Sequence, residues 1–169
     1  MQMRHKTKIA RALAAAAIIS LGAAGLARAQ PAAEPTHETI ASIENFSAGW
    51  SHVVASRGLV LFYKDKTGEA GVGKVSSTGV TTLQTFPKGN FGSGWTHIVP
   101  LSSGRILWYR ADNGAGAIGQ LDATGNHETL TSWEPGSFAK GWTRIVEGPN
   151  GLVLWYNGEN GKGAIGQLR

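Results

Sequence analysis

Glycines in two short stretches have the spacing of a phosphate-binding turn. Residues 112–121 read DNGAGAIGQL, in which Gly114, Gly116 and Gly119 give the pattern G-x-G-x-x-G. That pattern holds the pyrophosphate of a dinucleotide only where a strand leads through the glycines into a helix. The stretch recurs at residues 159–168 as ENGKGAIGQL, and no helical hydrophobic period follows either copy. We therefore expect hairpin turns here and no dinucleotide cofactor.

Other patterns that could support catalysis are incomplete. His37 and His127 each begin the sequence His-Glu-Thr, but both lack the second histidine of the metalloprotease motif H-E-x-x-H. His52 and His97 occupy equivalent repeat positions, and the third copy has Arg144, which does not ligate metals. The chain has no cysteine nucleophile and no G-x-S-x-G motif. We predict a binding protein without catalysis, cofactor or metal.

The glycine stretches belong to a threefold internal repeat. The units begin at Phe46, Phe91 and Phe138, so the period is 45 and then 47 residues. The second and third units share 18 identical residues in 31 aligned positions. Turn residues separate short runs of aromatic and β-branched residues, which predicts four strands in each unit.

The last segment of the third unit is found at the other end of the chain. HETIASIEN, which begins at His37, matches HETLTSWEP, which begins at His127. The two ends of the chain could therefore join by strand pairing, which indicates a closed or self-assembling object. The predicted units of the β domain 37–169 are 46–90, 91–137, and 138–169 completed by 37–45.

The repeat predicts an all-β fold of propeller-like blades. Gly94-Trp95, Gly104, Leu107 and Tyr109, which recur in the other units, resemble the repeat of tachylectin-type β-propeller lectins. This resemblance covers residues 37–169 and implies a propeller with a sugar ligand. A propeller usually needs four to eight blades. Two chains could therefore join as a homo-oligomer in one six-bladed ring, whereas a β-trefoil, the alternative fold, closes with three units.

The N-terminal residues are typical of a secretory signal peptide. A basic segment, an apolar run and small residues at Ala27 and Ala29 predict a leader at residues 1–29, followed by a flexible lead-in at 30–36. Five of the 16 basic residues lie in this leader, which leaves eleven against eleven acidic residues. We expect a periplasmic or extracellular protein that binds no nucleic acid and does not insert into a membrane after cleavage.

Aromatic and polar residues that recur at one register predict the ligand sites. Aromatic faces pack against sugar C–H groups, and amides and charged groups bind sugar hydroxyls, so we expect multivalent, lectin-like binding of glycans or glycoconjugates. A secreted protein-interaction or cell-surface structural module on the same scaffold is the alternative, and core packing is the competing role of each aromatic residue. The predicted binding residues are Phe62, Tyr63, Lys64, Trp108, Tyr109, Arg110, Asn113, Gln120, Trp155, Tyr156, Asn157, Asn160 and Gln167.

Overall fold

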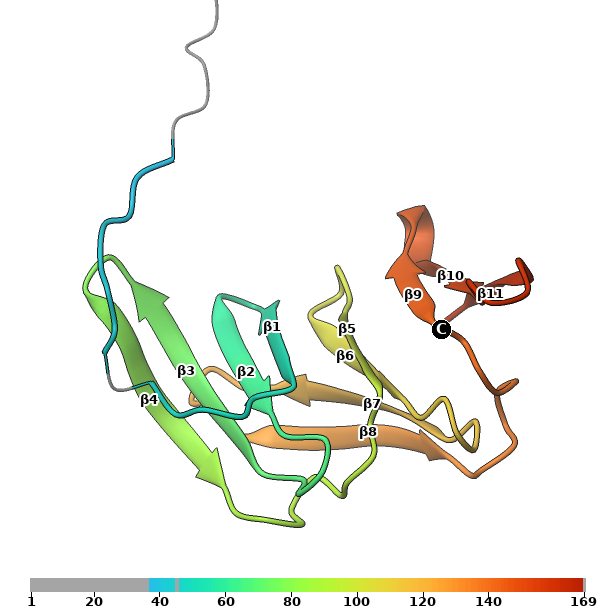
Figure 1. Ribbon diagram of the computed structural model, residues 1–169, viewed down its shortest axis with the longest axis horizontal. Helices are drawn as coiled ribbons and strands as arrows, with labels where there is room; N and C mark the ends of the chain where they lie inside the picture. Colours follow the sequence, from blue (N-terminus) through green and yellow to red (C-terminus); the bar gives the residue numbers. More distant parts are fainter. Residues whose placement is uncertain (1–36, 45, 169) are drawn as a thin grey trace, which may run out of the picture. The chain divides into compact units, whose positions relative to one another are not determined.

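The computed structural model of the protein describes residues 37–44 and 46–168 (Figure 1). Within these ranges the chain forms eleven strands, a short 3-10 turn at Pro149–Gly151 and no α-helix, which confirms the all-β prediction. No described helix is long and apolar enough to cross a membrane. The predicted leader at 1–29 and lead-in at 30–36 lie outside the described residues.

The strands form three antiparallel sheets that follow one another along the chain. Each sheet is built from strands that are consecutive in sequence, and no described strand of one sheet pairs with a strand of another. Sheet 1 contains β1 (His52–Ser56), β2 (Leu59–Tyr63), β3 (Ala70–Ser76) and β4 (Gly79–Phe86). Sheet 2 contains β5 (His97–Pro100), β6 (Arg105–Tyr109), β7 (Gly116–Leu121) and β8 (His127–Trp133). Sheet 3 contains β9 (Arg144–Glu147), β10 (Leu152–Tyr156) and β11 (Gly163–Gln167).

Sheets 1 and 2 share an irregularity that follows from their repeated sequence. The register between β3 and β4 shifts between Val72 and Gly73, so that Leu83 has no direct partner. The register between β7 and β8 shifts between Ile118 and Gly119, where the corresponding unpaired residue is Leu130. A β-bulge of this kind bends the outer strand and increases its twist.

The hydrophobic core lies between neighbouring sheets. One cluster joins residues of sheets 1 and 2, among them Leu61, Tyr63, Ile106 and Trp108, and a second cluster joins sheets 2 and 3. The first strands of the sheets lie side by side, since β1 contacts β5 and β5 contacts β9. His52 of β1 makes one bond across this contact, with its Nε2 atom 3.0 Å from the carbonyl oxygen of Thr96.

The outer edge of sheet 3 has no partner strand within the described chain. β11 pairs with β10 alone, whereas β3 and β7, its counterparts, each lie between two strands. Residues 38–44, the segment predicted to complete the third unit, are exposed and form no strand. The pairing of this segment with β11 therefore stays a prediction.

Candidate functional site: two equivalent aromatic pockets

A pocket of about 280 Å³ lies where the loop between β4 and β5 crosses sheet 2. We call it the aromatic pocket. β6, β7 and β8 supply one wall, and the end of β4 with the following loop supplies the other. Its lining residues are Phe86, Asn90, Phe91, Trp95, Trp108, Ala117, Gly119, His127 and Thr129.

Three rings in mutual contact give the aromatic pocket its shape. Phe91 stacks on Trp108 with 5.3 Å between ring centroids, and His127 lies edge-on to Trp108 at 5.7 Å. The imidazole of His127 occupies the space that a Cβ at Gly119 would fill. A side chain at this position would have to displace the imidazole, so Gly119, the last glycine of the G-x-G-x-x-G pattern, makes room for the histidine.

Two polar atoms in this wall have no hydrogen-bond partner in the described chain. They are Nε1 of Trp108 and Nε2 of His127, and both are buried. Burial lowers the pKa of His127, which favours the neutral imidazole with one donor and one acceptor nitrogen. A buried polar group without a partner is costly, so these two atoms leave hydrogen-bonding capacity unsatisfied beside the pocket.

Sheet 1 forms an equivalent pocket of about 270 Å³. Phe46, Trp50 and Phe62 stand there at the repeat positions of Phe91, Trp95 and Trp108. Thr82 corresponds to Thr129, and Val80 replaces His127. Nε1 of Trp50 is likewise buried without a partner in the described chain. The pocket is therefore a property of the repeat, with a more polar lining in sheet 2.

The structure places most of the predicted aromatic binding residues in the core. Phe62, Tyr63, Trp108, Tyr109 and Trp155 are all less than 9% exposed, whereas Tyr156 is 41% exposed. Of these residues, Phe62 and Trp108 line the two pockets.

The two buried tyrosines join neighbouring sheets. The hydroxyl of Tyr63 donates to the carbonyl of Gly92 at 2.9 Å, and that of Tyr109 donates to the carbonyl of Ala139 at 2.7 Å. Burial raises the pKa of both tyrosines, so their hydroxyls remain protonated donors.

The predicted residues at the ends of β2, β6 and β10 hold the Gly-Trp loop of each repeat. Lys64 Nζ lies 4.8 Å from the ring centre of Trp50, and the guanidinium of Arg110 lies 4.5 Å from that of Trp95. Asn157 instead donates through Nδ2 to the carbonyl of Gly141 at 2.9 Å. These side chains therefore fix the tryptophan loops beside the pockets.

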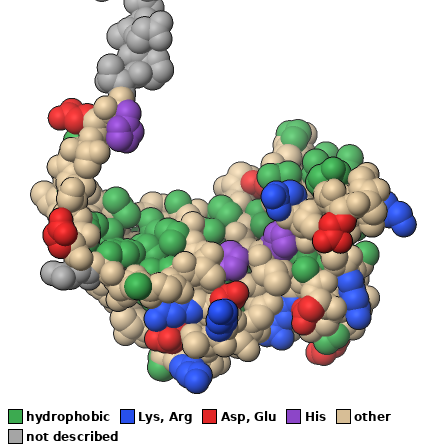
Figure 2. Space-filling model, in the orientation of Figure 1, with side chains coloured by type: hydrophobic (Ala, Val, Ile, Leu, Met, Phe, Trp, Pro, Cys, Tyr) green, Lys and Arg blue, Asp and Glu red, His purple; other side chains and the backbone are tan. Residues whose placement is uncertain are grey.

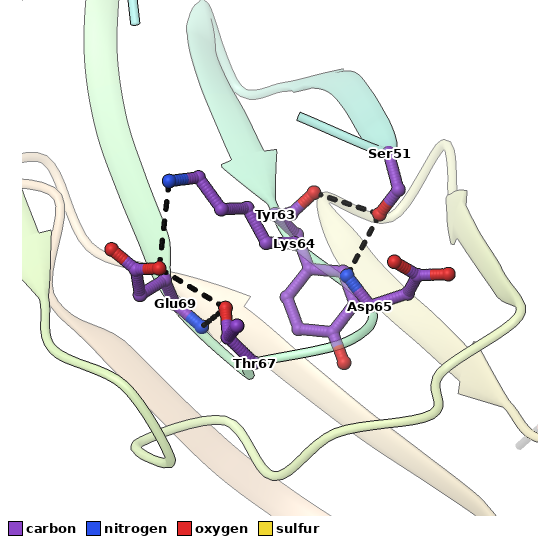
Figure 3. A network of polar contacts seen from close by, with 6 residues as sticks. All are labelled: Ser51, Tyr63, Lys64, Asp65, Thr67 and Glu69. Atoms are coloured by element: carbon purple, nitrogen blue, oxygen red, sulfur yellow. Dashed lines mark hydrogen bonds and ion pairs between the residues drawn. The ribbon is translucent and has the colours of Figure 1, made fainter. Parts of the chain in front are cut away.

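A hydroxyl that follows each loop tryptophan strengthens the same region (Figure 3). Ser51 donates to the carbonyl of Tyr63 at 3.0 Å and accepts from the backbone N–H of Asp65 at 2.8 Å. Beside it, Lys64 forms an ion pair with Glu69 at 3.4 Å. Thr96 makes the same two bonds in sheet 2: its hydroxyl donates to the carbonyl of Tyr109 and accepts from the N–H of Ala111. In sheet 3, the hydroxyl of Thr143 donates to the carbonyl of Tyr156 and accepts from the N–H of Gly158.

The remaining predicted binding residues make local bonds away from the two pockets. Asn113 and Asn160 accept from the backbone N–H two residues ahead, which stabilises the turns. Gln120 donates to the Glu128 carboxylate at 2.9 Å across β7 and β8. Gln167 lies 3.4 Å from the carbonyl of Asn150.

Sequence reasoning did not select Phe91, Trp95 or His127 as binding residues. The available signal was their recurrence, because all three positions repeat along the chain, His127 as His37. The decisive feature was the crossing of the loop over the sheet, which a sequence pattern does not specify. No group of three potential metal ligands occurs among the residues that the structure describes.

Comparison with known proteins returned no relative of this chain. A scan against protein-family models, a search of curated proteins and a search of solved structures each found no match. The resemblance to tachylectin-type repeats therefore stays a prediction from the sequence, and function is inferred from the repeated pockets.

Proposed function

We propose that this chain is a secreted carbohydrate-binding protein whose aromatic pockets each bind one sugar unit. The observation that carries the proposal is one pocket that combines aromatic rings with the polar side chains of Asn90, His127 and Thr129. Sugars combine apolar C–H faces with many hydroxyls. Phe91, which is partly exposed, suits the former, and Asn90, His127 and Thr129 suit the latter.

Binding without catalysis agrees with the pocket lining. Of the residues that the structure describes around the aromatic pocket, none is a carboxylate. Hydrolysis of a glycosidic bond commonly needs two carboxyl groups on either side of the bond. Asn90, Thr129 and His127 instead supply groups that can hydrogen-bond to sugar hydroxyls.

We further propose that the three sheets are propeller-like blades that present equivalent sites. The repeated strand order and the contacts between the first strands β1, β5 and β9 support this arrangement. Trefoil units would share a barrel, and the described sheets remain separate. Several weak sites on one particle raise the avidity for a surface with many sugars, by about 100-fold or more.

A glycan array tests the proposal directly. We expect the fluorescently labelled protein to bind a defined group of glycans and to be displaced by millimolar concentrations of the corresponding free sugar. Absence of signal on every glycan, at a concentration where multivalent binding is measurable, would contradict the proposal. That result would leave the protein-interaction module as the alternative function.

Replacing His127 with phenylalanine tests the pocket itself. His127→Phe keeps an aromatic ring and removes both imidazole nitrogens, so we expect at least about tenfold weaker binding of the free sugar. The matched control is His97→Phe, which makes the same chemical change in β5 outside the pocket residues. Calorimetry measures both affinities, and near-ultraviolet circular dichroism checks that both variants are folded. Equal affinities would place the site elsewhere.

A further inference from the structure

An outer strand and the loop that follows it connect sheet 1 to sheet 2 and sheet 2 to sheet 3, and we call this connection a junction. Sheet 3 presents the receiving half of a further junction. β11 lacks the outer neighbour that β3 and β7 have, and its Ile165 is 73% exposed, whereas the equivalent Ile118 is 6% exposed. An unpaired strand edge with an exposed apolar side chain is a template for another strand. Figure 2 shows apolar side chains on the surface in the region of β9–β11 and again over sheet 1.

The glycine in the third strand marks where an outer strand fits. A Cβ at Gly73 would lie 2.8 Å from Val80 of β4, and the same space at Gly119 is taken by His127 of β8. Gly166 keeps this glycine, yet a Cβ there would meet only Trp155, at 3.5 Å. The repeat thus leaves room over Gly166 for a side chain from an outer strand.

Sheet 3 also has an open position for the loop that follows an outer strand. The carbonyls of Gly68 and Gly114 accept the N–H groups of Phe91 and Phe138 at 3.3 and 3.0 Å, which fixes each loop against the preceding sheet. At the equivalent Gly161, a Cβ would meet no atom within 4 Å.

Tyr156, the tyrosine beside this position, is exposed where its counterparts are buried. Tyr63 and Tyr109, which bond the loop leading to the next sheet, are fully buried, and Tyr156 is 41% exposed. Sheet 3 therefore carries the receiving groups of a junction whose other half is absent from the described contacts.

The matching half stands at the beginning of the domain. Residues 38–44 carry the outer-strand sequence but are exposed and unpaired with any strand, and Ile40 is 68% exposed. Phe46, which follows them, occupies the repeat position of Phe91 and Phe138 and is 42% exposed. Ile43 and Phe46 already line the pocket on their own sheet 1.

We propose that residues 38–44 of a second copy of this chain pair with β11 and complete sheet 3 as its fourth strand. The register follows from that of β7 and β8. Gly163 pairs with Ile43, Ala164 with Ser42, Ile165 with Ala41 and Gly166 with Thr39, and the bulge falls at Ile40. Phe46 of the second copy then bonds Gly161, and Tyr156 bonds the carbonyl of Ser47.

We assign the added strand to a second copy because each chain has one segment to donate, residues 38–44, and one receiving edge, β11. These lie at opposite ends of its series of three sheets. Head-to-tail contacts of this kind form rings when the rotation closes. Propellers have about four to eight blades, and multiples of three in that range allow only six, so two copies close the ring. This inference does not depend on carbohydrate binding.

Engineered disulfides test the register, since the chain contains no cysteine. Chains with Ser42→Cys are mixed with chains carrying Ala164→Cys at micromolar concentration and oxidised. We expect a disulfide-linked dimer between the two different variants, detected by non-reducing electrophoresis and mass spectrometry. The matched control is Ala41→Cys mixed with Ala164→Cys, which should give little dimer because a one-residue shift turns the side chain to the other face.

Three results of the cross-linking experiment would overturn the proposal. They are absence of the mixed dimer, equal linkage in the Ala41→Cys control, and a disulfide within single chains when Ser42→Cys and Ala164→Cys are combined in one chain. The last result would show that a chain completes its own third sheet. Sedimentation of the unmodified chain gives a second readout. We expect a dimer, and a chain that stays monomeric would contradict the ring. Loss of glycan binding in a chain that still dimerises would separate failure of the proposed function from failure of this inference.

Discussion

Sheets 2 and 3 have nearly the same sequence and very different surroundings. Tyr109 is fully buried and its counterpart Tyr156 is 41% exposed, and Leu107 is fully buried where Leu154 is 43% exposed. Sheet 2 lies between two other sheets, whereas sheet 3 has a described neighbour on one side. The comparison teaches that the repeat specifies each sheet locally, while burial depends on the next copy of the repeat.

The largest difference between the two sheets is expected at the isoleucine of the third strand. Ile118→Ala removes a side chain packed between sheets 2 and 3 and should cost about 2–5 kcal/mol of unfolding free energy. Ile165→Ala changes an exposed side chain and should cost about 0.5 kcal/mol or less in dilute protein.

Urea unfolding at two protein concentrations measures this difference. At the higher concentration the Ile165→Ala variant should lose more stability than in dilute solution, because association buries the position. Equal losses for the two variants in dilute protein would contradict the assigned neighbours.

A smaller difference is expected at the glycine under the outer strand. Gly119→Ala places a methyl group against the imidazole of His127 and should destabilise the protein by about 1–3 kcal/mol. Gly166→Ala has ordinary contact distances in the isolated chain, so its effect in dilute solution should be well below that of Gly119→Ala. Thermal unfolding of the two variants, with wild type as reference, checks the order. A larger loss for Gly166→Ala would contradict it.

The smallest effect is expected from pH. Burial lowers the pKa of His127 below its ordinary value of 6.5, so below pH 6.5 the unfolded chain binds a proton more readily than the folded chain. Stability should therefore fall as the pH drops from about 7.5 to 5.5, and His127→Phe should flatten this slope. Urea midpoints across this range measure it. An unchanged slope in the variant would assign the effect to other groups. One of these is His97, because burial lowers its pKa as well.

The sequence was sufficient to predict the all-β class and the repetition of antiparallel sheets along the chain. Turn glycines and aromatic runs recur with a fixed order, and that order determines which strands pair by hairpins. The sequence also places the outer-strand segment HETIASI before the first unit, and its pairing with β11 stays a prediction.

The chemistry of the pocket was less predictable. Lys64 and Arg110 were expected as sugar ligands because they recur beside aromatic residues, but they lie over the loop tryptophans. The sequence around His127 gave only an incomplete metalloprotease motif. The role of this histidine depends on the outer strand crossing Gly119 next to Phe91, and this contact joins segments that are far apart in sequence.

Backbone hydrogen exchange in β11 tests most directly the claim that sheet 3 is half of a junction. Mass spectrometry compares peptides that cover β11 with peptides that cover β7 in dilute and in concentrated protein. We predict rapid exchange of β11 in dilute protein and protection that approaches that of β7 as the concentration rises. Protection of β11 that is independent of concentration, or exchange that stays rapid throughout, would contradict the account.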